Sequence, residues 1–149
     1  MYHKRKYTPI HPEKYAGDPT NVIMRSSWET KFAIWCDHNP SIIQWVSEEI
    51  VIPYICPTDN KAHRYFVDFV IKVKERSGAI KTYLVEIKPD VQTRPPQNPG
   101  RVTKRYLMEV MTYGKNEAKW KAATEYARRR GWEFKVLTEY DLGLAKRNK

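Results

Sequence analysis

The length, composition and charge of the chain narrow its fold and function before any motif is considered. Its 149 residues suffice for one hydrophobic core and are too few for two ordinary domains. The two cysteines exclude a disulfide framework, and no apolar run predicts a signal peptide or a membrane-spanning helix. The excess of 27 Lys and Arg over 17 Asp and Glu, a net charge of +10, is typical of polyphosphate-binding proteins, although solubility alone would also explain it. We expect one soluble domain that works in a reducing cytoplasm, without a membrane partner.

The chain divides into three predicted parts. Residues 1–22 hold several prolines and show little periodicity, so we expect an extended basic arm that lies on the domain or on a partner. Periodic patterns fill residues 23–145, which we assign to a single domain. Residues 146–149 then form a short basic tail.

The domain begins with a predicted helix and a strand region. From Ser26 large apolar residues recur at helical spacing, and Asn39 followed by Pro40 predicts the end of this helix. Residues 42–55 are rich in β-branched and aromatic residues, with an interruption near residues 47–49. This region is therefore expected to form one bent strand or two short ones.

A hairpin is predicted next. Side chains alternate along residues 63–74, where Asp68 interrupts an otherwise apolar stretch. A turn at residues 76–78 leads to a returning strand at residues 80–88, which Pro89 ends. The two strands should pair in antiparallel fashion.

The last third of the chain predicts a loop, helices and one more strand. Residues 90–100 are rich in proline and polar residues, as expected of a loop that contacts a ligand. Residues 101–130 have helical character and predict two consecutive helices broken near Gly114, and residues 132–137 predict a final strand. The resulting order, αβββαβ, predicts an α/β fold with a mixed sheet of four or slightly more strands flanked by helices.

Three polar residues in this plan suggest a reaction centre. Glu86 and Lys88 lie two apart in one strand and therefore share a face of the sheet, and the hairpin register could place Asp68 beside Glu86. Carboxylate oxygens suit Mg²⁺, which can activate water and neutralise charge on a phosphate, and a lysine can orient that water or stabilise the developing charge. Inside a basic domain, the trio predicts a metal-dependent deoxyribonuclease.

The same residues carry a family resemblance. Val67-Asp68-Phe69 followed by Val85-Glu86-Ile87-Lys88 resembles the active-site signature of the PD-(D/E)XK nuclease superfamily, although Val67 stands where the motif name has proline. The superfamily has a restriction-endonuclease-like core in the order inferred above. Further stretches resemble the endonuclease subunit of heteromeric transposases and the head-completion nucleases of T-even-type tailed bacteriophages: Ser27-Trp28-Glu29, the Tyr65 to Asp68 strand and residues 131–139. The resemblance covers roughly residues 22–141.

This resemblance implies a site and a biological task. Asp68 and Glu86 would bind Mg²⁺, with Mn²⁺ as a substitute, Glu29 would complete the metal site, and Lys88 would be the catalytic lysine. The implied task is endonuclease and exonuclease processing of packaged DNA during head completion and head–tail joining in an infected bacterium. Head, portal or neck proteins would then be partners, with virion association left open.

Structural alternatives stand beside these assignments. Glu29 follows Ser26 at capping-box spacing and could serve only as a helix cap. Glu86 and Lys88 could be a solvated edge pair, but Leu84 shares their face, which favours a site at the sheet's end. A zinc site built from the two cysteines and two histidines matches no standard spacing. These four residues are Cys36, His38, Cys56 and His63.

Basic residues near the predicted loop are candidates for DNA contact, although most such residues are simply solvated. We select four of them: Arg94, Arg101, Lys104 and Arg105. A rival interpretation is a nonenzymatic DNA-end or head-neck binding protein that retains the nuclease fold. An RNA-binding module is a third, but the chain carries no signature of one.

Overall fold

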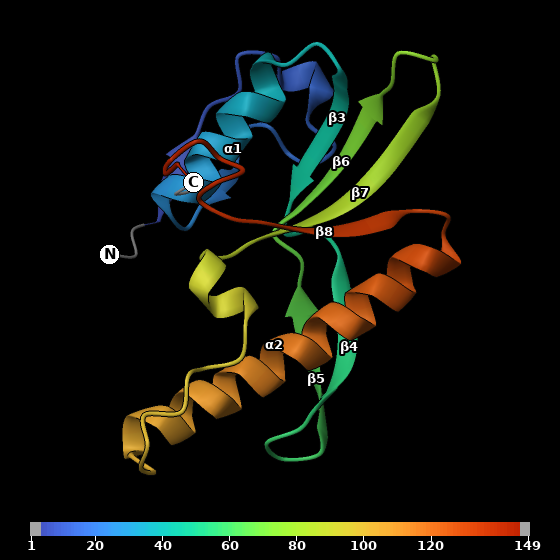
Figure 1. The fold of residues 1–149 in the computed structure, drawn as a ribbon. Helices are drawn as coiled ribbons and strands as arrows, with labels where there is room; N and C mark the ends of the chain where they lie inside the picture. The colour runs from blue at the N-terminus through green and yellow to red at the C-terminus, as the bar shows by residue number, and fades with distance from the viewer. Residues whose placement is uncertain (1–3, 147–149) are drawn as a thin grey trace.

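A computed structural model describes residues 4–146, so the ends of the predicted arm and tail, residues 1–3 and 147–149, lie outside the described residues. The central feature is a four-stranded sheet in the order β3-β6-β7-β8 (Figure 1). Strands β3 (Ile42–Ser47), β6 (Phe69–Lys74) and β7 (Ile80–Ile87) form an antiparallel meander, and β8 (Glu133–Leu137) joins β7 in parallel. The predicted mixed sheet is confirmed.

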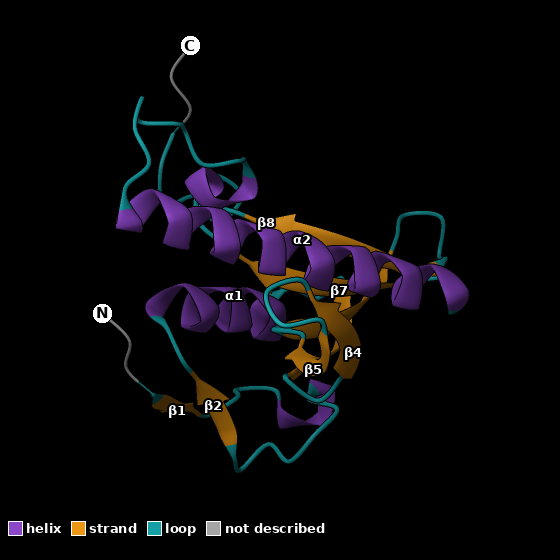
Figure 2. Ribbon diagram, turned by 90° about the horizontal axis from the view of Figure 1, so that it is seen from below, coloured by secondary structure: helices purple, strands orange, loops and turns teal. Residues whose placement is uncertain are grey.

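Two helices cover opposite faces of this sheet, α1 (Ser27–His38) and α2 (Lys104–Arg129) (Figure 2). Alternate side chains of β7 enter two different cores, as a strand's period of two requires. Val85 and Ile87 pack on the α1 side, whereas Leu84 packs on the α2 side with Ala123 and Ala127 of α2. The fold is therefore the predicted α/β sandwich.

Helix α1 has the boundaries that its sequence predicts. The Ser26 hydroxyl accepts a hydrogen bond from the Glu29 backbone N–H at 3.1 Å, which satisfies a free donor of the first turn. At the other end the Asn39 N–H reaches the Trp35 carbonyl at 3.0 Å, and Pro40 follows. The buried face of the helix carries Phe32, Ala33 and Cys36.

A second, two-stranded sheet is formed by β4 (Val51–Cys56) and β5 (Lys61–Phe66). Residues 42–55 thus form two short strands, one of the two predicted alternatives. The single strand predicted for residues 63–74 is wrong, because the chain divides it into β5 and β6 at residues 67 and 68.

The break between the two sheets lies at matching points of the two chain segments. Glu48 has a φ of 51°, and its N–H donates to the Asp68 carbonyl at 3.1 Å. Just beyond, the Val67 N–H donates to the Ile50 carbonyl at 3.1 Å. Hydrogen bonds thus continue across the break, and the two sheets together are one long bent hairpin whose bend places Asp68 at their junction.

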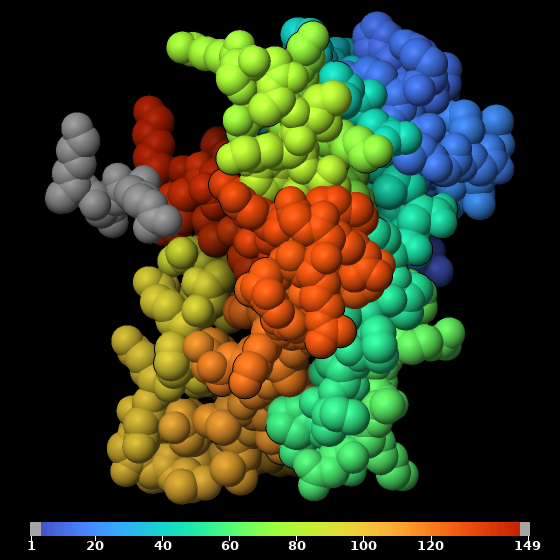
Figure 3. Space-filling view, turned by 90° about the vertical axis from the view of Figure 1, so that its right-hand side faces the viewer, coloured from blue at the N-terminus to red at the C-terminus, as the bar shows by residue number. Residues whose placement is uncertain are grey.

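Helix α2 is a single helix of 26 residues, so the predicted break near Gly114 is wrong. Glycine in a helix interior costs about 1 kcal/mol relative to alanine, which packing can offset. The later half of α2 buries Ala123 and Ala127 against the β4–β5 hairpin and β8. Figure 3 shows this half of the helix, in orange, beside the green hairpin.

The N-terminal segment packs against the domain. Strands β1 (Arg5–Tyr7) and β2 (Val22–Met24) pair with each other, and a 3-10 helix, η1 (Pro12–Lys14), lies between them. Tyr15 and Val22 are buried in the α1-side core.

Asp37, fully buried near the end of α1, anchors this segment. Its carboxylate accepts hydrogen bonds from the Tyr7 hydroxyl at 2.6 Å and from the N–H groups of Ile10 and His11 at 2.7 and 3.0 Å. Lys14 adds bonds from its ammonium group to three carbonyls at the end of α1, which satisfy free acceptors of the last turn.

The connection from β7 to α2 holds a short 3-10 helix, η2 (Asp90–Thr93), followed by an irregular stretch up to Thr103, which caps α2. This is the loop that the sequence predicts. Among residues 4–146, no helix is both long enough and apolar enough to cross a membrane.

Candidate active site

Asp68 lies where β6 begins and the bend ends, next to the C-terminal end of β7. Phe69 pairs with Val85, so the next position back along β6 faces Glu86. On the side of β7, Asp68 is held by its side chain: Oδ2 accepts a hydrogen bond from the Ile87 N–H at 2.8 Å. Because of the bend, the carboxylate of Asp68 is held against the backbone of β7.

Glu86 is buried beside it, with 7% of its surface exposed. It points to the α2 side of the sheet, and the hydroxyl group of Tyr65 on β5 donates a hydrogen bond to its Oε2 atom. A buried carboxylate needs such a donor, because its desolvation is otherwise costly. Tyr65 therefore holds Glu86 in one orientation.

The two carboxyl groups are close enough to perturb each other. Burial raises the pKa of Asp68 well above its usual value, and the neighbouring Glu86 raises it further through its charge and a hydrogen bond. The Ile87 N–H acts in the opposite direction. A divalent cation between the two groups would offset this repulsion, and carboxylate oxygens are the donors that Mg²⁺ prefers. The donor set therefore fits the metal that the sequence predicts.

Glu29 makes the contacts of a helix cap and also lies near the acidic pair. Its Oε1 atom accepts a long hydrogen bond from the Arg25 N–H at 3.4 Å, and its Oε2 atom accepts one from the Ser26 hydroxyl at 3.4 Å. Burial raises the pKa of Glu29, and the charge of Glu86 adds to this effect. Glu29 is therefore a cap in this structure, and its service as a third metal ligand stays a prediction.

Lys88 follows the last residue of β7 and lies on the same side of the chain as Glu86. Its N–H donates to the Leu137 carbonyl of β8 at 2.9 Å, which extends the parallel pairing past the end of the strand and fixes its backbone. Asp68 and Glu86 thus adjoin each other at the end of β7, and Lys88 follows two residues after Glu86; that the three act as one site stays a prediction.

A different set of possible ligands gathers in the turn between β4 and β5. The ligand atoms of Cys56, Asp59 and His63 lie within 4.8 Å of one another, and within residues 4–146 they form the one such group of three or more His, Cys, Asp or Glu. The carboxylates of Glu29, Asp68 and Glu86 are less tightly gathered than that. Cys36, by contrast, packs on the other face of the sheet, so the zinc set considered from the sequence is not assembled.

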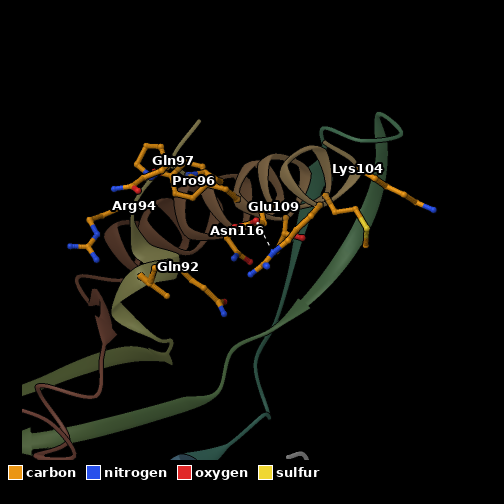
Figure 4. A pocket seen from close by; sticks show the side chains of 13 residues that line it. Gln92, Arg94, Pro96, Gln97, Lys104, Glu109 and Asn116 are labelled. Atoms are coloured by element: carbon orange, nitrogen blue, oxygen red, sulfur yellow. Dashed lines mark ion pairs between the residues drawn. The ribbon is translucent and has the colours of Figure 1, made fainter. Parts of the chain in front are cut away.

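Three of the predicted DNA-contacting residues, Arg94, Lys104 and Arg105, line a cleft of about 1190 Å³ between the 90–100 loop and the first half of α2. Arg101 is not among its lining residues. Arg94 pairs with Asp90 at 3.0 Å and Arg105 with Glu109 at 3.4 Å. In the view of Figure 4, Glu109 and Asn116 lie between Arg94 and Lys104.

This cleft begins just beyond the end of β7, since Val91 and Gln92 line it, but it does not include Asp68, Glu86 or Lys88. The buried side chain of Asn116 lines it, one helical turn before Lys119. Asn116 therefore marks the side of the cleft that is nearest to the acidic pair along α2.

Two further residues at the site, Tyr65 and Lys119, were not selected from the sequence. Tyr65 and Val67 both lie on the buried side of the hairpin, two residues apart. The sequence pattern at Tyr65 is therefore that of an ordinary core residue. Lys119 stands three residues after Asn116 and four before Ala123, on the stripe of α2 that faces the sheet. A lysine on that stripe is the one sequence signal that could have identified it.

Comparison with known proteins shows the family of this chain. Residues 39–139 match the protein family described as TnsA-like endonuclease N terminal, a range that contains Asp68, Glu86 and Lys88. Over 143 residues the chain is 43% identical to the head completion nuclease of Enterobacteria phage T4, and the alignment covers 93% of each chain. The resemblance inferred from the sequence is confirmed, and the chain belongs to the TnsA-like endonuclease family, a PD-(D/E)XK-type nuclease family.

Proposed function

We propose that this protein is a Mg²⁺-dependent deoxyribonuclease whose reaction centre is Asp68, Glu86 and Lys88. The observation that carries the proposal is the pair of adjacent carboxyl groups at the end of β7, where burial and mutual repulsion raise the pKa of Asp68. When both carboxyl groups are ionised, this repulsion has no compensation from a charged partner within hydrogen-bond distance in the described part of the chain. A bound cation would turn it into a favourable interaction.

Each residue has a separate task in this proposal. Asp68 and Glu86 would hold the metal, and Glu29, on the first turn of α1, would complete its ligands. When bound, Mg²⁺ supplies a Lewis acid that polarises the phosphodiester and lowers the pKa of its water. Lys88 contacts the attacking water or a non-bridging phosphate oxygen and stabilises the negative charge that develops there.

The direct test is cleavage of supercoiled plasmid DNA by the full chain with Mg²⁺, with Mn²⁺ and with EDTA. Asp68→Asn and Lys88→Met should each lower the cleavage rate by at least about a hundredfold, the usual cost of losing one group that stabilises charge at a reaction centre. Glu117→Gln, on the exposed surface of α2, is the matched control for loss of a carboxylate. Unchanged cleavage by both site variants would rule out this centre, and a parallel assay on RNA tests the choice of nucleic acid.

We assign the cleft beside α2 to the DNA backbone, with Arg94, Lys104 and Arg105 as phosphate contacts and Arg101 beside them. A phosphate contact supplies affinity without sequence preference and makes binding sensitive to salt. Lys104→Gln should weaken DNA binding for every sequence and reduce the slope of log K against log salt by about 0.9. Lys31→Gln on α1 should leave the slope unchanged.

The relative's name, head completion nuclease, suggests the setting of this activity. We propose that the protein acts on packaged DNA during head completion, in contact with head or neck proteins of a phage. In cells infected by a phage that lacks this protein, the wild-type chain should restore particles with joined heads and tails, and Asp68→Asn should not. Restoration by Asp68→Asn would favour the alternative, a nonenzymatic DNA-end or neck-binding protein, as would salt-sensitive DNA binding without cleavage.

A further inference from the structure

Lys119 occupies an unusual position for a lysine. On α2, the residues that face the sheet recur at Asn116, Ala123 and Ala127, all of them buried, and Lys119 falls on the same stripe. Its ammonium nitrogen lies 5.7 Å from the centre of the Tyr65 ring and 6.0 Å from that of the Tyr54 ring. Lys119 is half-buried, and its ammonium group lies over the hairpin residue that holds Glu86.

Lys119 makes no ion pair among the described residues. Within residues 4–146, no carboxylate lies within 4.0 Å of Lys119, of Lys88 or of Lys115, one turn earlier on α2. Burial lowers the pKa of Lys119, and the positive charge of Lys88 lowers it further, while Glu86 acts in the opposite direction. Two ammonium groups thus approach one reaction centre from two elements, β7 and α2, and repel each other.

We propose that Lys119 is a second phosphate-contacting residue of the active site, opposite Lys88, which binds a non-bridging oxygen of the DNA backbone. This inference rests on the proposed function. An apolar residue at position 119 would complete the inward stripe of α2 without the desolvation cost of an ammonium group. Binding of an external anion would explain why a lysine stands there. The cleft beside α2 ends at Asn116, one helical turn before Lys119, so a strand held at Lys104 would point along α2 toward Lys119.

The test compares Lys119→Met with Lys119→Arg and with Lys121→Met, an exposed lysine two residues further along α2. Methionine keeps the buried stem and removes the charge. Binding of a fluorescent duplex is measured in EDTA over a series of salt concentrations, and Mg²⁺-dependent cleavage gives kcat and KM. Thermal unfolding of each variant without DNA reports the fold.

Lys119→Met should weaken duplex binding and kcat/KM by about tenfold or more, the effect of one charge-assisted hydrogen bond. The salt slope should fall by about 0.9, while the melting temperature stays equal or rises because a half-buried charge that Lys88 repels is gone. Lys119→Arg should recover most of the salt slope, and Lys121→Met should match the wild type.

Two results would overturn the inference. The first is a salt slope and kcat/KM for Lys119→Met equal to those of Lys121→Met. The second is a lower melting temperature with an unchanged salt slope, which assigns Lys119 to the fold. If the wild-type chain binds DNA and cleaves none, the proposed function fails, and the salt slope of Lys119→Met still decides the role of Lys119.

Discussion

The hydroxyl group of Tyr65 donates a hydrogen bond to Glu86 across the junction of two sheets, since Tyr65 lies on β5 and Glu86 on β7. The bond links the bent hairpin to the strand that carries the candidate reaction centre. It also raises the pKa of Tyr65, together with burial, which is the larger cause. Tyr65 therefore stays a neutral donor over the whole working range of pH, and Glu86 stays its acceptor.

Replacement of Tyr65 by phenylalanine removes this donor and keeps the ring. We expect the Mg²⁺ concentration for half-maximal cleavage to rise by about 10-fold to 100-fold, because residues that orient metal ligands have effects of this size. Magnesium titrations of the cleavage rate measure it. Tyr126→Phe, in the same core but on α2, should leave the Mg²⁺ concentration for half-maximal cleavage unchanged. An unaltered Mg²⁺ requirement in Tyr65→Phe would contradict the positioning role.

Magnesium should stabilise the folded protein without any DNA. Ligand that binds only the folded state adds about 2.7 kcal/mol at a concentration of 100 times Kd. The melting temperature of the wild type should therefore rise with Mg²⁺, and that of Asp68→Asn should not. Without metal, Asp68→Asn should be as stable as the wild type or more so, because the repulsion with Glu86 is relieved. Equal Mg²⁺ shifts in both proteins would place the Mg²⁺ site elsewhere.

Asp37 should make the fold sensitive to acid. Burial opposes its ionisation, but hydrogen bonds from Tyr7, Ile10 and His11 outweigh this and hold its pKa below the usual value. Its contribution to stability is therefore complete above the pKa of the unfolded chain and is lost as the pH falls through the lower folded pKa. We expect the free energy of unfolding of the wild type to decrease below about pH 4.

Asp37→Asn should lower the free energy of unfolding at pH 7 by about 1–3 kcal/mol, since buried donors lose a charged acceptor, and should flatten the decrease in acid. Urea unfolding between pH 3 and pH 7 measures both effects. Glu117→Gln on the surface of α2 is the control. A parallel acid dependence in Asp37→Asn and the wild type would assign the effect to other carboxyl groups.

Two glycines, one inside α2 and one just after it, should respond in opposite directions to replacement by alanine. A Cβ atom at Gly114 would lie 3.8 Å from Pro57, an ordinary contact, so Gly114→Ala should stabilise the protein by about 0.5–1 kcal/mol through helix propensity. Gly131, just after the helix, has a φ of 72°. Gly131→Ala should destabilise by about 1 kcal/mol, because alanine pays a steric penalty in that conformation. Urea unfolding measures both, and destabilisation by Gly114→Ala would indicate strain at Pro57.

The sequence predicts the strands and helices well where a pattern is local and long. The alternation of residues 80–88 and the helical repeat after Ser26 both appear in the structure with nearly the expected bounds. Predictions failed where packing outweighs local preference. The glycine at position 114 suggests a break, but burial of the later half of α2 compensates for its small local cost.

The division at residues 67 and 68 shows the same limit in a strand. The alternating pattern runs through these residues without a turn signal, so a single strand is the natural prediction. In the structure, the matching segment at Glu48 adopts a positive φ, and the bend needs both segments at once. The sequence around residues 67 and 68 alone therefore cannot predict the bend.

By itself, the sequence determined that Glu86 and Lys88 share a face, because a period of two is a property of any extended backbone, and that Asp68 would lie on a paired strand. Only the tertiary structure identified two of their neighbours, Tyr65 across the junction and Lys119 from the inward stripe of α2. It also placed Glu29, which the family resemblance had implied, near Glu86 from the first turn of α1. The reason is physical. Backbone geometry sets the direction of a side chain within its own element, whereas the distance between elements far apart in the chain depends on how their buried surfaces pack.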